Sequence, residues 1–293
     1  MKKETIAIEF KKIQEEICSS ISDLDGKCTF ESDKWERKEG GGGDTRVLQN
    51  GNIFDKAGVN FSEVFGPITD KMKTAFTFEA ESFYATGVSI VMHPTNPFMP
   101  IIHMNIRYFE LPGKTWWFGG GIDLTPIYVD ENEAKYFHQE LKKTCDRYDT
   151  NYYPKFKNWA DDYFYIPHRK ETRGIGGIFF DHLNGDDKDS IFEFVCAVGR
   201  TFANTYCEII KNKKEKTYTT QNIEWQSKRR SRYVEFNLVY DRGTKFGLET
   251  DGRVESILMS MPPVAKWHYN FVPEIGSEEE HTSGFLKKGK AWI

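Results

Sequence analysis

The sequence predicts an α+β fold in which helices pack on a largely antiparallel β-sheet. Apolar residues recur at helical spacing in some segments, whereas apolar runs of strand length fill others. The predicted strands are joined mostly by turns and loops too short for the crossover that a parallel pair requires, so neighbouring strands should run antiparallel. No period of about 20 to 50 residues repeats, which excludes a solenoid or a propeller.

Composition narrows the class of protein further. The chain has 293 residues, of which 39% are hydrophobic and 29% charged, as in soluble globular proteins. Its net charge of −4 argues against a nucleic-acid-binding protein, because such domains carry a basic excess. The 15% of aromatic residues indicate either a large core or a pocket for a flat organic ligand.

The five cysteines and the apolar runs indicate the cellular compartment of the protein. The cysteines form no C-x-x-C pair, which favours reduced thiols and a cytoplasmic protein. No apolar run approaches the length of a membrane span. The N-terminal segment has no apolar core of a signal peptide, and its four glutamates do not suit a transit peptide, which is poor in acidic residues.

The first elements are a helix and a glycine-rich segment. Isoleucine and phenylalanine recur at helical spacing over residues 2–24, and Gly26 is a plausible stop. The run Gly40–Gly43 resembles a phosphate-binding loop only superficially, because no G-K-[ST] follows it. We expect these glycines to form a mobile loop.

Two strands should follow, over residues 84–92 and from Pro100 onward. In the second strand His103, Asn105 and Arg107 alternate with apolar residues, so their side chains should share one face. A titratable base, an amide and a fixed cation in one row suit an anionic ligand. The alternative is the solvated face of an ordinary amphipathic strand, and the pattern alone does not separate the two.

A third strand should begin at Trp116 and contain three glycines, Gly119–Gly121. Glycines inside a strand allow a ligand or another chain segment to approach the backbone closely. Asp123, which follows them, is either a site carboxylate or a turn residue before Thr125.

The second half should begin with helices and end with a β-meander. We expect Asp130 to cap the helix over 130–148 and Ser190, with Glu193, to cap the helix over 190–211. We interpret Asp251-Gly252 as a hairpin turn and Lys228–Arg232 as the solvated start of a strand. The other predicted elements are a helix over 154–162 and strands over 174–181, 232–240, 245–250 and 253–261.

Familiar catalytic motifs are absent from the sequence. It contains no G-x-S-x-G, H-E-x-x-H or G-x-G-x-x-G, which disfavours a Rossmann-type NAD or flavin enzyme. The spacing of His93, His103, His138 and His168 matches no metal-ligand motif, so no metal is predicted.

Long segments nevertheless resemble a known family. These include GGGGDTRVLQNGNIFDKAGVNFSEVFG, FYATGVSIVMHPTNPFMPIIHMNIRYFE and WWFGGGIDLTP, and matching segments cover nearly all of residues 38–270 in order. The chain resembles oxygen-dependent coproporphyrinogen III oxidase. The resemblance implies a single domain over 1–293, with a large flat antiparallel sheet between two helix layers. Residues 1–26 would be an N-terminal helix, and 274–293 a C-terminal extension that is either a surface element or part of a dimer contact.

The resemblance also implies a reaction. Two propionates of coproporphyrinogen III would become vinyl groups with loss of two CO₂, giving protoporphyrinogen IX in haem biosynthesis. Molecular oxygen would be the co-substrate, with no organic cofactor. We expect no metal either, because oxygen chemistry on an electron-rich pyrrole does not need one. A homodimer would form through the region 233–268. The alternatives are a non-catalytic tetrapyrrole carrier and a metal-dependent oxygenase.

Site residues follow from the same resemblance. It implies His103 as a proton donor and Asp123 as a carboxylate that holds pyrrole N–H groups. His93, His138 and His168 match positions that some members are proposed to use for a divalent metal. The positions that match substrate contacts are Ser89, Asn105, Ile106, Arg107, Asp251, Gly252 and Arg253.

Overall fold

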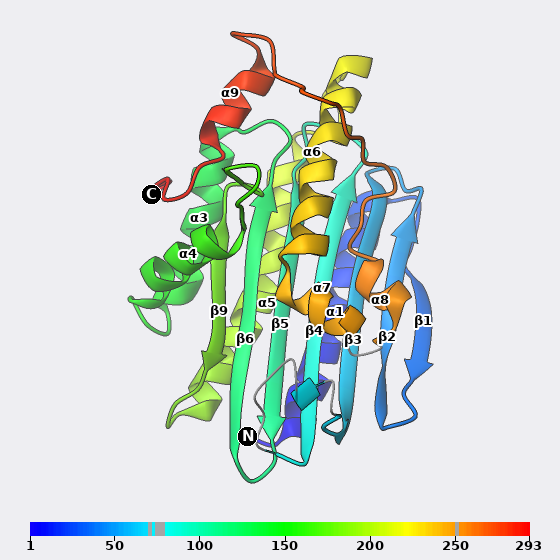
Figure 1. Cartoon of the computed structure of the whole chain (residues 1–293), viewed down its shortest axis with the longest axis vertical. Helices are drawn as coiled ribbons and strands as arrows, with labels where there is room; N and C mark the ends of the chain where they lie inside the picture. Colours follow the sequence, from blue (N-terminus) through cyan, green and yellow to red (C-terminus); the bar gives the residue numbers. More distant parts are fainter. Residues whose placement is uncertain (70–71, 74–79, 250–251) are drawn as a thin grey trace.

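The fold is built on one seven-stranded antiparallel sheet (Figure 1), which confirms the predicted α+β class. The computed structural model describes residues 1–69, 72–73, 80–249 and 252–293. Every neighbouring pair of strands is antiparallel, in the order β1-β2-β3-β4-β5-β6-β9. The strands are β1 (Glu31–Glu36), β2 (Gly41–Gln49), β3 (Phe54–Pro67), β4 (Ser82–Pro94), β5 (Ile101–Leu111), β6 (Thr115–Thr125) and β9 (Gly177–Leu183).

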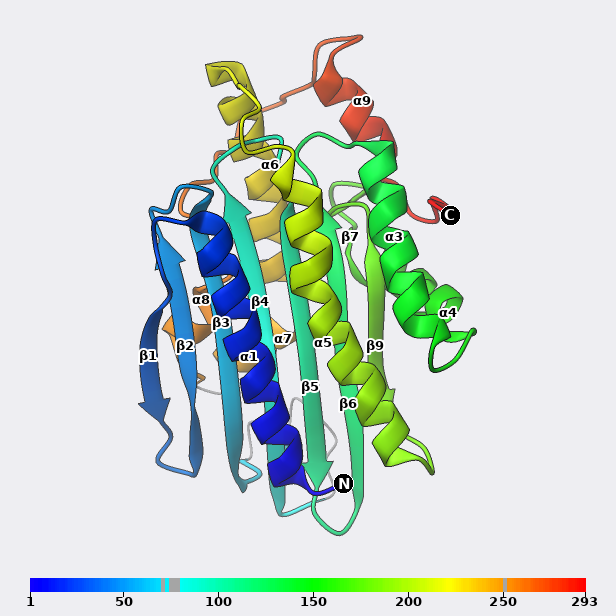
Figure 2. The same ribbon diagram turned by 180° about the vertical axis from the view of Figure 1, so that it is seen from behind.

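Helices cover both faces of this sheet. Helices α1 and α5 lie across one face (Figure 2), and α6, α7 and α8 lie across the other (Figure 1). Helices α3 and α4 pack beside the β9 edge, next to a small hairpin of β7 (Tyr165–Ile166) and β8 (Glu171–Thr172). The helices are α1 (Lys3–Asp25), α3 (Glu131–Asp146), α4 (Tyr152–Tyr163), α5 (Lys188–Lys211), α6 (Thr220–Val239), α7 (Arg242–Glu249), α8 (Val254–Leu258) and α9 (Glu278–Phe285).

The main core lies between the sheet and the α1–α5 layer. Ile102, Met104 and Ile106 of β5 point into it and are fully buried, as their alternation predicts. Phe10 of α1 and Phe202 of α5 cover them from the helix side. Burial of a large apolar side chain contributes about 1.5–3 kcal/mol, so this face fixes the register of the central strands.

Three helix ends test the capping predictions. Gly26 ends α1 with a left-handed φ of 70°, and Asp130 caps α3 by accepting from the backbone N–H groups of Asn132 and Glu133, both as predicted. The cap predicted at Ser190 is wrong. Asp187 caps α5 instead, and its carboxylate accepts from the Ser190 N–H at 2.9 Å.

The prediction of a mobile loop at Gly40–Gly43 is also wrong. Gly41 begins β2, and Gly43 pairs with Trp35 of β1 and Ser62 of β3. A Cβ at Gly43 would lie 2.5 Å from the Phe61 carbonyl oxygen and would overlap the Trp35 indole. These glycines serve close packing within the sheet rather than loop freedom.

The predicted C-terminal meander is wrong as well, because this region is helical. In α6, Tyr233, Phe236 and Asn237 are buried at positions i, i+3 and i+4. Lys228–Arg232 lies within the same helix rather than at the start of a strand, and its buried Arg229 and Arg230 pair with distant carboxylates. The predicted strands 245–250 and 253–261 are replaced by α7, α8 and a turn.

The predicted Asp251-Gly252 hairpin falls partly outside the described residues, which do not include Asp251. Gly252 is described, and its N–H donates to the Gly247 carbonyl at 2.8 Å, so the chain turns back onto α7 there.

The C-terminal segment 274–293 is integrated into the fold. Tyr128 donates to Glu279 of α9 at 2.6 Å, and the buried Trp292 indole donates to the Ile175 carbonyl at 3.0 Å. The five cysteines, all in the described residues, are free thiols as predicted. None of the described helices is long and apolar enough to cross a membrane.

The tight packing at Gly43 predicts a stability difference. Gly43→Ala should lower the free energy of unfolding by about 1–3 kcal/mol because the new methyl group overpacks the sheet. Gly284→Ala is the control, because no atom lies within 4 Å of a Cβ there. Urea unfolding monitored by circular dichroism measures both variants, and equal midpoints would contradict the packing account.

Candidate active site

The sheet face under α6 carries the predicted polar row. Asn105 pairs directly with Ser89 of β4 and Gly121 of β6, and His103 pairs with Asp123 of β6. Directly opposite residues of paired strands point to the same face, so these side chains share the surface that faces α6. The predicted common face of His103, Asn105 and Arg107 is therefore confirmed.

At one end of this row His103, Asp123 and Arg173 form a hydrogen-bonded cluster. His103 Nδ1 lies 2.9 Å from Asp123 Oδ1. Arg173 donates two hydrogen bonds to the same carboxylate, from Nη2 to Oδ1 at 2.6 Å and from Nε to Oδ2 at 3.1 Å. Asp123 lies inside β6 and is 1% exposed, so it is not the turn residue that was the alternative.

Arg173 is held by rings as well as by charge. Its guanidinium carbon lies 4.5 Å from the ring centroid of Phe164, 4.7 Å from Tyr233 and 4.6 Å from Phe236. The Asn237 side chain accepts a further hydrogen bond at 3.3 Å. Cation–π contacts in a desolvated site contribute about 2 kcal/mol or more, which offsets part of the cost of burying the charge.

Electrostatics keep the carboxylate ionised. Burial alone would raise the pKa of Asp123, but the charge of Arg173 and the hydrogen bond from His103 hold that pKa below its ordinary value. Burial likewise works against the charge on Arg173, and Asp123 raises the pKa of Arg173 above its ordinary value. Asp123 and Arg173 therefore form a buried ion pair, and the His103 side chain, 19% exposed, is the part that reaches the surface.

Arg107 continues the polar row beyond Asn105. Its Nη1 donates to Asn105 Oδ1 at 2.8 Å, and its Nη2 lies 2.9 Å from Asp181 of β9. The guanidinium lies over Gly119, where a Cβ would come within 2.7 Å of it. On the opposite face a Cβ at Gly120 would come within 2.8 Å of the Phe180 ring. At two of the three glycines the group that approaches the backbone closely is therefore a side chain of the protein itself.

Three of the other predicted substrate-binding residues lie in different environments. Ser89 stands beside Asn105 in the row, whereas the side chain of Ile106 points to the opposite face and is buried in the core. Arg253 precedes α8 and pairs with Asp33 of β1.

Arg253 is connected to the row by a polar track. Asp33, Thr45, Asn60, Ser89 and Asn105 are successive cross-strand partners from β1 to β5. Strands are spaced about 4.8 Å apart, so Asp33 and Ser89 are separated by roughly 14 Å. The structure places Arg253 on the same face as His103 but several strands away.

The three other histidines are not brought together. Buried His93 contacts the Ser260 carbonyl at 2.8 Å, and buried His138 contacts the Tyr153 hydroxyl and the Ile175 carbonyl. His168 contacts Tyr240 and Glu235. Burial lowers the pKa of His93 to about 3 and that of His138 to about 4. In the described part of the chain, no group of three or more His, Cys, Asp or Glu residues is placed to hold a metal ion.

The sequence did not predict that Arg173 pairs with Asp123 or that Asp181 pairs with Arg107. The sequence does not indicate a partner for Arg173, but in the fold its guanidinium is occupied by Asp123. Arg169 is paired with Glu235 in the same way. The signal for Asp181 was its position at the end of a glycine-rich strand, which is the same pattern that drew attention to Asp123.

Comparison with known proteins agrees with the sequence resemblance. A family described as "Coproporphyrinogen III oxidase" matches residues 5–292 of the chain. The curated relatives include "Coproporphyrinogen-III oxidase 1, chloroplastic" from Arabidopsis thaliana. It is 47% identical over 295 residues, which cover 96% of this chain and 76% of the relative.

Because Asp123 and Arg173 form a buried ion pair, the effects of substituting both on the free energy of unfolding should be strongly non-additive. Asp123→Asn should lower the free energy of unfolding by about 3–5 kcal/mol, because it leaves the Arg173 charge buried without its partner. Asp123→Asn combined with Arg173→Met should be less destabilised than Asp123→Asn alone.

Urea unfolding of the two single variants and the double variant measures this coupling. The control is Asp162→Asn, which breaks an exposed pair with Lys288 and should cost about 1 kcal/mol or less. Additive effects of Asp123→Asn and Arg173→Met would contradict a coupled buried pair.

Proposed function

This chain belongs to the coproporphyrinogen III oxidase family, and from that premise we propose how its site performs the reaction. The chain is an oxidoreductase that converts two propionates of coproporphyrinogen III to vinyl groups in haem biosynthesis. The observation that carries our proposal is the cluster in which a buried ion pair holds a partly exposed histidine at the end of a polar row.

The balance of the reaction defines what the site must do. Each step breaks the bond between the propionate Cα and its carboxylate, releases CO₂, and removes one hydrogen with two electrons from the carbon next to the ring. Oxygen accepts those two electrons, that hydrogen and one further proton, which gives one H₂O₂ for each vinyl group formed. The protein therefore has to orient a propionate and deliver a proton.

We assign proton delivery to His103. Its Nδ1 faces Asp123, so an imidazolium would direct its second N–H, on Nε2, toward a ligand on the sheet face. No hydrogen bond among the described residues uses Nε2. The ionised Asp123 stabilises the imidazolium, and Arg173 fixes the carboxylate in place.

Asp123 then acts as a positioning residue in this proposal. The family resemblance assigns it contact with pyrrole N–H groups, but both of its oxygens are engaged and buried. Arg107 can meet a propionate, because its side chain is 35% exposed and a guanidinium binds a carboxylate in two bonds. The propionate would share this guanidinium with Asp181, which lies 2.9 Å from Nη2. Ser89 and Asn105 supply neutral hydrogen-bonding groups beside Arg107.

We further propose that oxygen is the sole co-substrate, with no metal or organic cofactor. An electron-rich reduced pyrrole can give electrons to oxygen directly, which is the chemical support for this proposal. Turnover that survives exhaustive chelation and dialysis supports it. Loss of activity that a divalent metal restores would favour the metal-dependent oxygenase instead.

A homodimer through the region 233–268 is also proposed. Its support is the exposed apolar surface of Val254, Val264 and Trp267, which Tyr269 and Val272 extend. Light scattering should give twice the chain mass, and Trp267→Glu should shift the protein toward monomer. A monomeric wild-type protein at micromolar concentration would overturn the proposal.

The cytoplasm is the proposed compartment, supported by the five free thiols. Immunolocalisation in the source cells tests this, since the plant relative is named as chloroplastic. Signal confined to an organelle would contradict the proposal.

The assignment of His103 predicts a selective loss of rate. His103→Gln should reduce kcat by about 10²–10⁴-fold, because the proton donor is lost. The CO₂ released from coproporphyrinogen III under air, with an anaerobic blank, measures turnover.

His281→Gln serves as the matched control, because His281 lies on α9 and packs against Phe285. It should keep its rate. Near-normal turnover of His103→Gln would remove His103 from the mechanism, and absence of CO₂ release in the wild type would favour the tetrapyrrole carrier.

A further inference from the structure

A small basic cavity lies apart from the His103 cluster. It has a volume of about 110 Å³ and lies between α6, the segment 266–273 and Ser283 of α9. A single water needs roughly 10–15 Å³ of such space, so the cavity has room for an anion of several atoms. Its titratable lining residues are Lys228, Arg229, Arg232, Lys266, His268 and Glu171.

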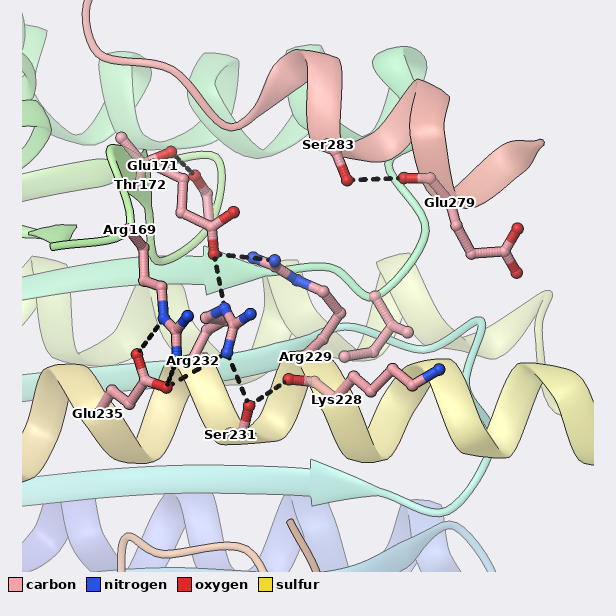
Figure 3. Close-up of polar contacts among 12 residues, drawn as sticks. Arg169, Glu171, Thr172, Lys228, Arg229, Ser231, Arg232, Glu235, Glu279 and Ser283 are labelled. Atoms are coloured by element: carbon pink, nitrogen blue, oxygen red, sulfur yellow. Dashed lines mark hydrogen bonds and ion pairs between the residues drawn. The ribbon is translucent and has the colours of Figure 1, made fainter. Parts of the chain in front are cut away.

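The positive charges in this lining exceed its carboxylate. Glu171 is shared by two guanidinium groups (Figure 3), with Arg229 Nη1 at 2.9 Å and Arg232 Nε at 3.4 Å. Burial lowers the pKa of Arg232, and the charges of Arg169 and Arg229 add to this against the opposing charges of Glu235 and Glu171. Glu235 lies 3.2 Å from Arg232 Nη1 and also pairs with Arg169, so three guanidinium groups share two carboxylates, with Lys228 beside them. This excess of positive charge favours an additional anion.

One donor in this cluster has no acceptor. Arg229 is 4% exposed, and its Nε has no hydrogen-bond partner among the described residues. A buried charged donor without a partner is costly, and such groups are normally satisfied by protein, water or ligand. Arg229 also lines the cavity, so an oxyanion there would lie beside its guanidinium group.

We propose that this cavity binds a phosphate group, either as free phosphate or as a phosphomonoester. A tetrahedral dianion supplies several acceptor oxygens and two charges to Arg229, Arg232 and Lys228. A monocarboxylate supplies only one charge and a planar pair of oxygens. None of the lining residues belongs to the cluster of His103, Asp123 and Arg173, so this site differs from the one assigned to the propionates.

Isothermal titration of the full chain with inorganic phosphate tests the site, at constant ionic strength and with acetate as the comparison. One phosphate should bind per chain, and acetate should bind at least about tenfold more weakly. Lys228→Gln should weaken phosphate binding by about tenfold, the loss expected for one charged hydrogen bond. Glycerol 2-phosphate separates the two sources: binding equal to phosphate indicates a phosphomonoester, and failure to bind indicates free phosphate.

Two further variants sharpen the test. Lys142→Gln makes the same charge change on α3, where Lys142 pairs with Asp146 outside the cavity, and should leave the affinity unchanged. Glu171→Gln removes the competing carboxylate and should tighten phosphate binding. The proposal is overturned by absence of phosphate binding, by equal affinity for acetate, by wild-type affinity in Lys228→Gln, or by weaker binding in folded Glu171→Gln.

Discussion

The ion pair between Asp123 and Arg173 is the interaction on which the site depends. Asp123 comes from β6, next to the edge strand β9, whereas Arg173 lies between the β7–β8 hairpin and β9. Taking both charges out of water costs several kcal/mol each, and only bidentate geometry with further partners offsets that cost. His103, Asn237 and three aromatic rings are those partners. The pair therefore joins strand, hairpin and α6 around one histidine.

The two faces of the sheet are built for different tasks. The face toward α1 and α5 carries large apolar side chains and holds the central strands in register. The face toward α6 carries small or polar residues at the alternate positions of the same strands, among them Gly87, Ser89, Asn105 and Gly119. Because successive side chains of a strand point to opposite faces, the same strands supply a dense core on one face and a polar surface on the other. A reduced tetrapyrrole with charged propionates suits such a surface.

The sequence predicted the parts of the fold that follow local periodicity. The alternation around His103 predicted both the strand and its polar face, and the apolar stripe of residues 2–24 predicted α1. Helix α6 was missed because Arg229 and Arg230 lie on its buried side. They are buried only because carboxylates distant in the chain, Glu171 and Asp55, pair with them. The role of Arg173 was hidden for the same reason, since nothing near it in sequence indicates its partner.

The most direct test of this account is an experimental structure with a coproporphyrin analogue bound. We expect the ring to lie on the face toward α6, with His103 Nε2 and the Arg107 guanidinium within hydrogen-bond distance of one propionate. The contact between Asp123 and Arg173 should persist in that complex. A ring bound elsewhere would contradict the account, and so would an Asp123 carboxylate that has left Arg173 to bind the pyrrole N–H groups.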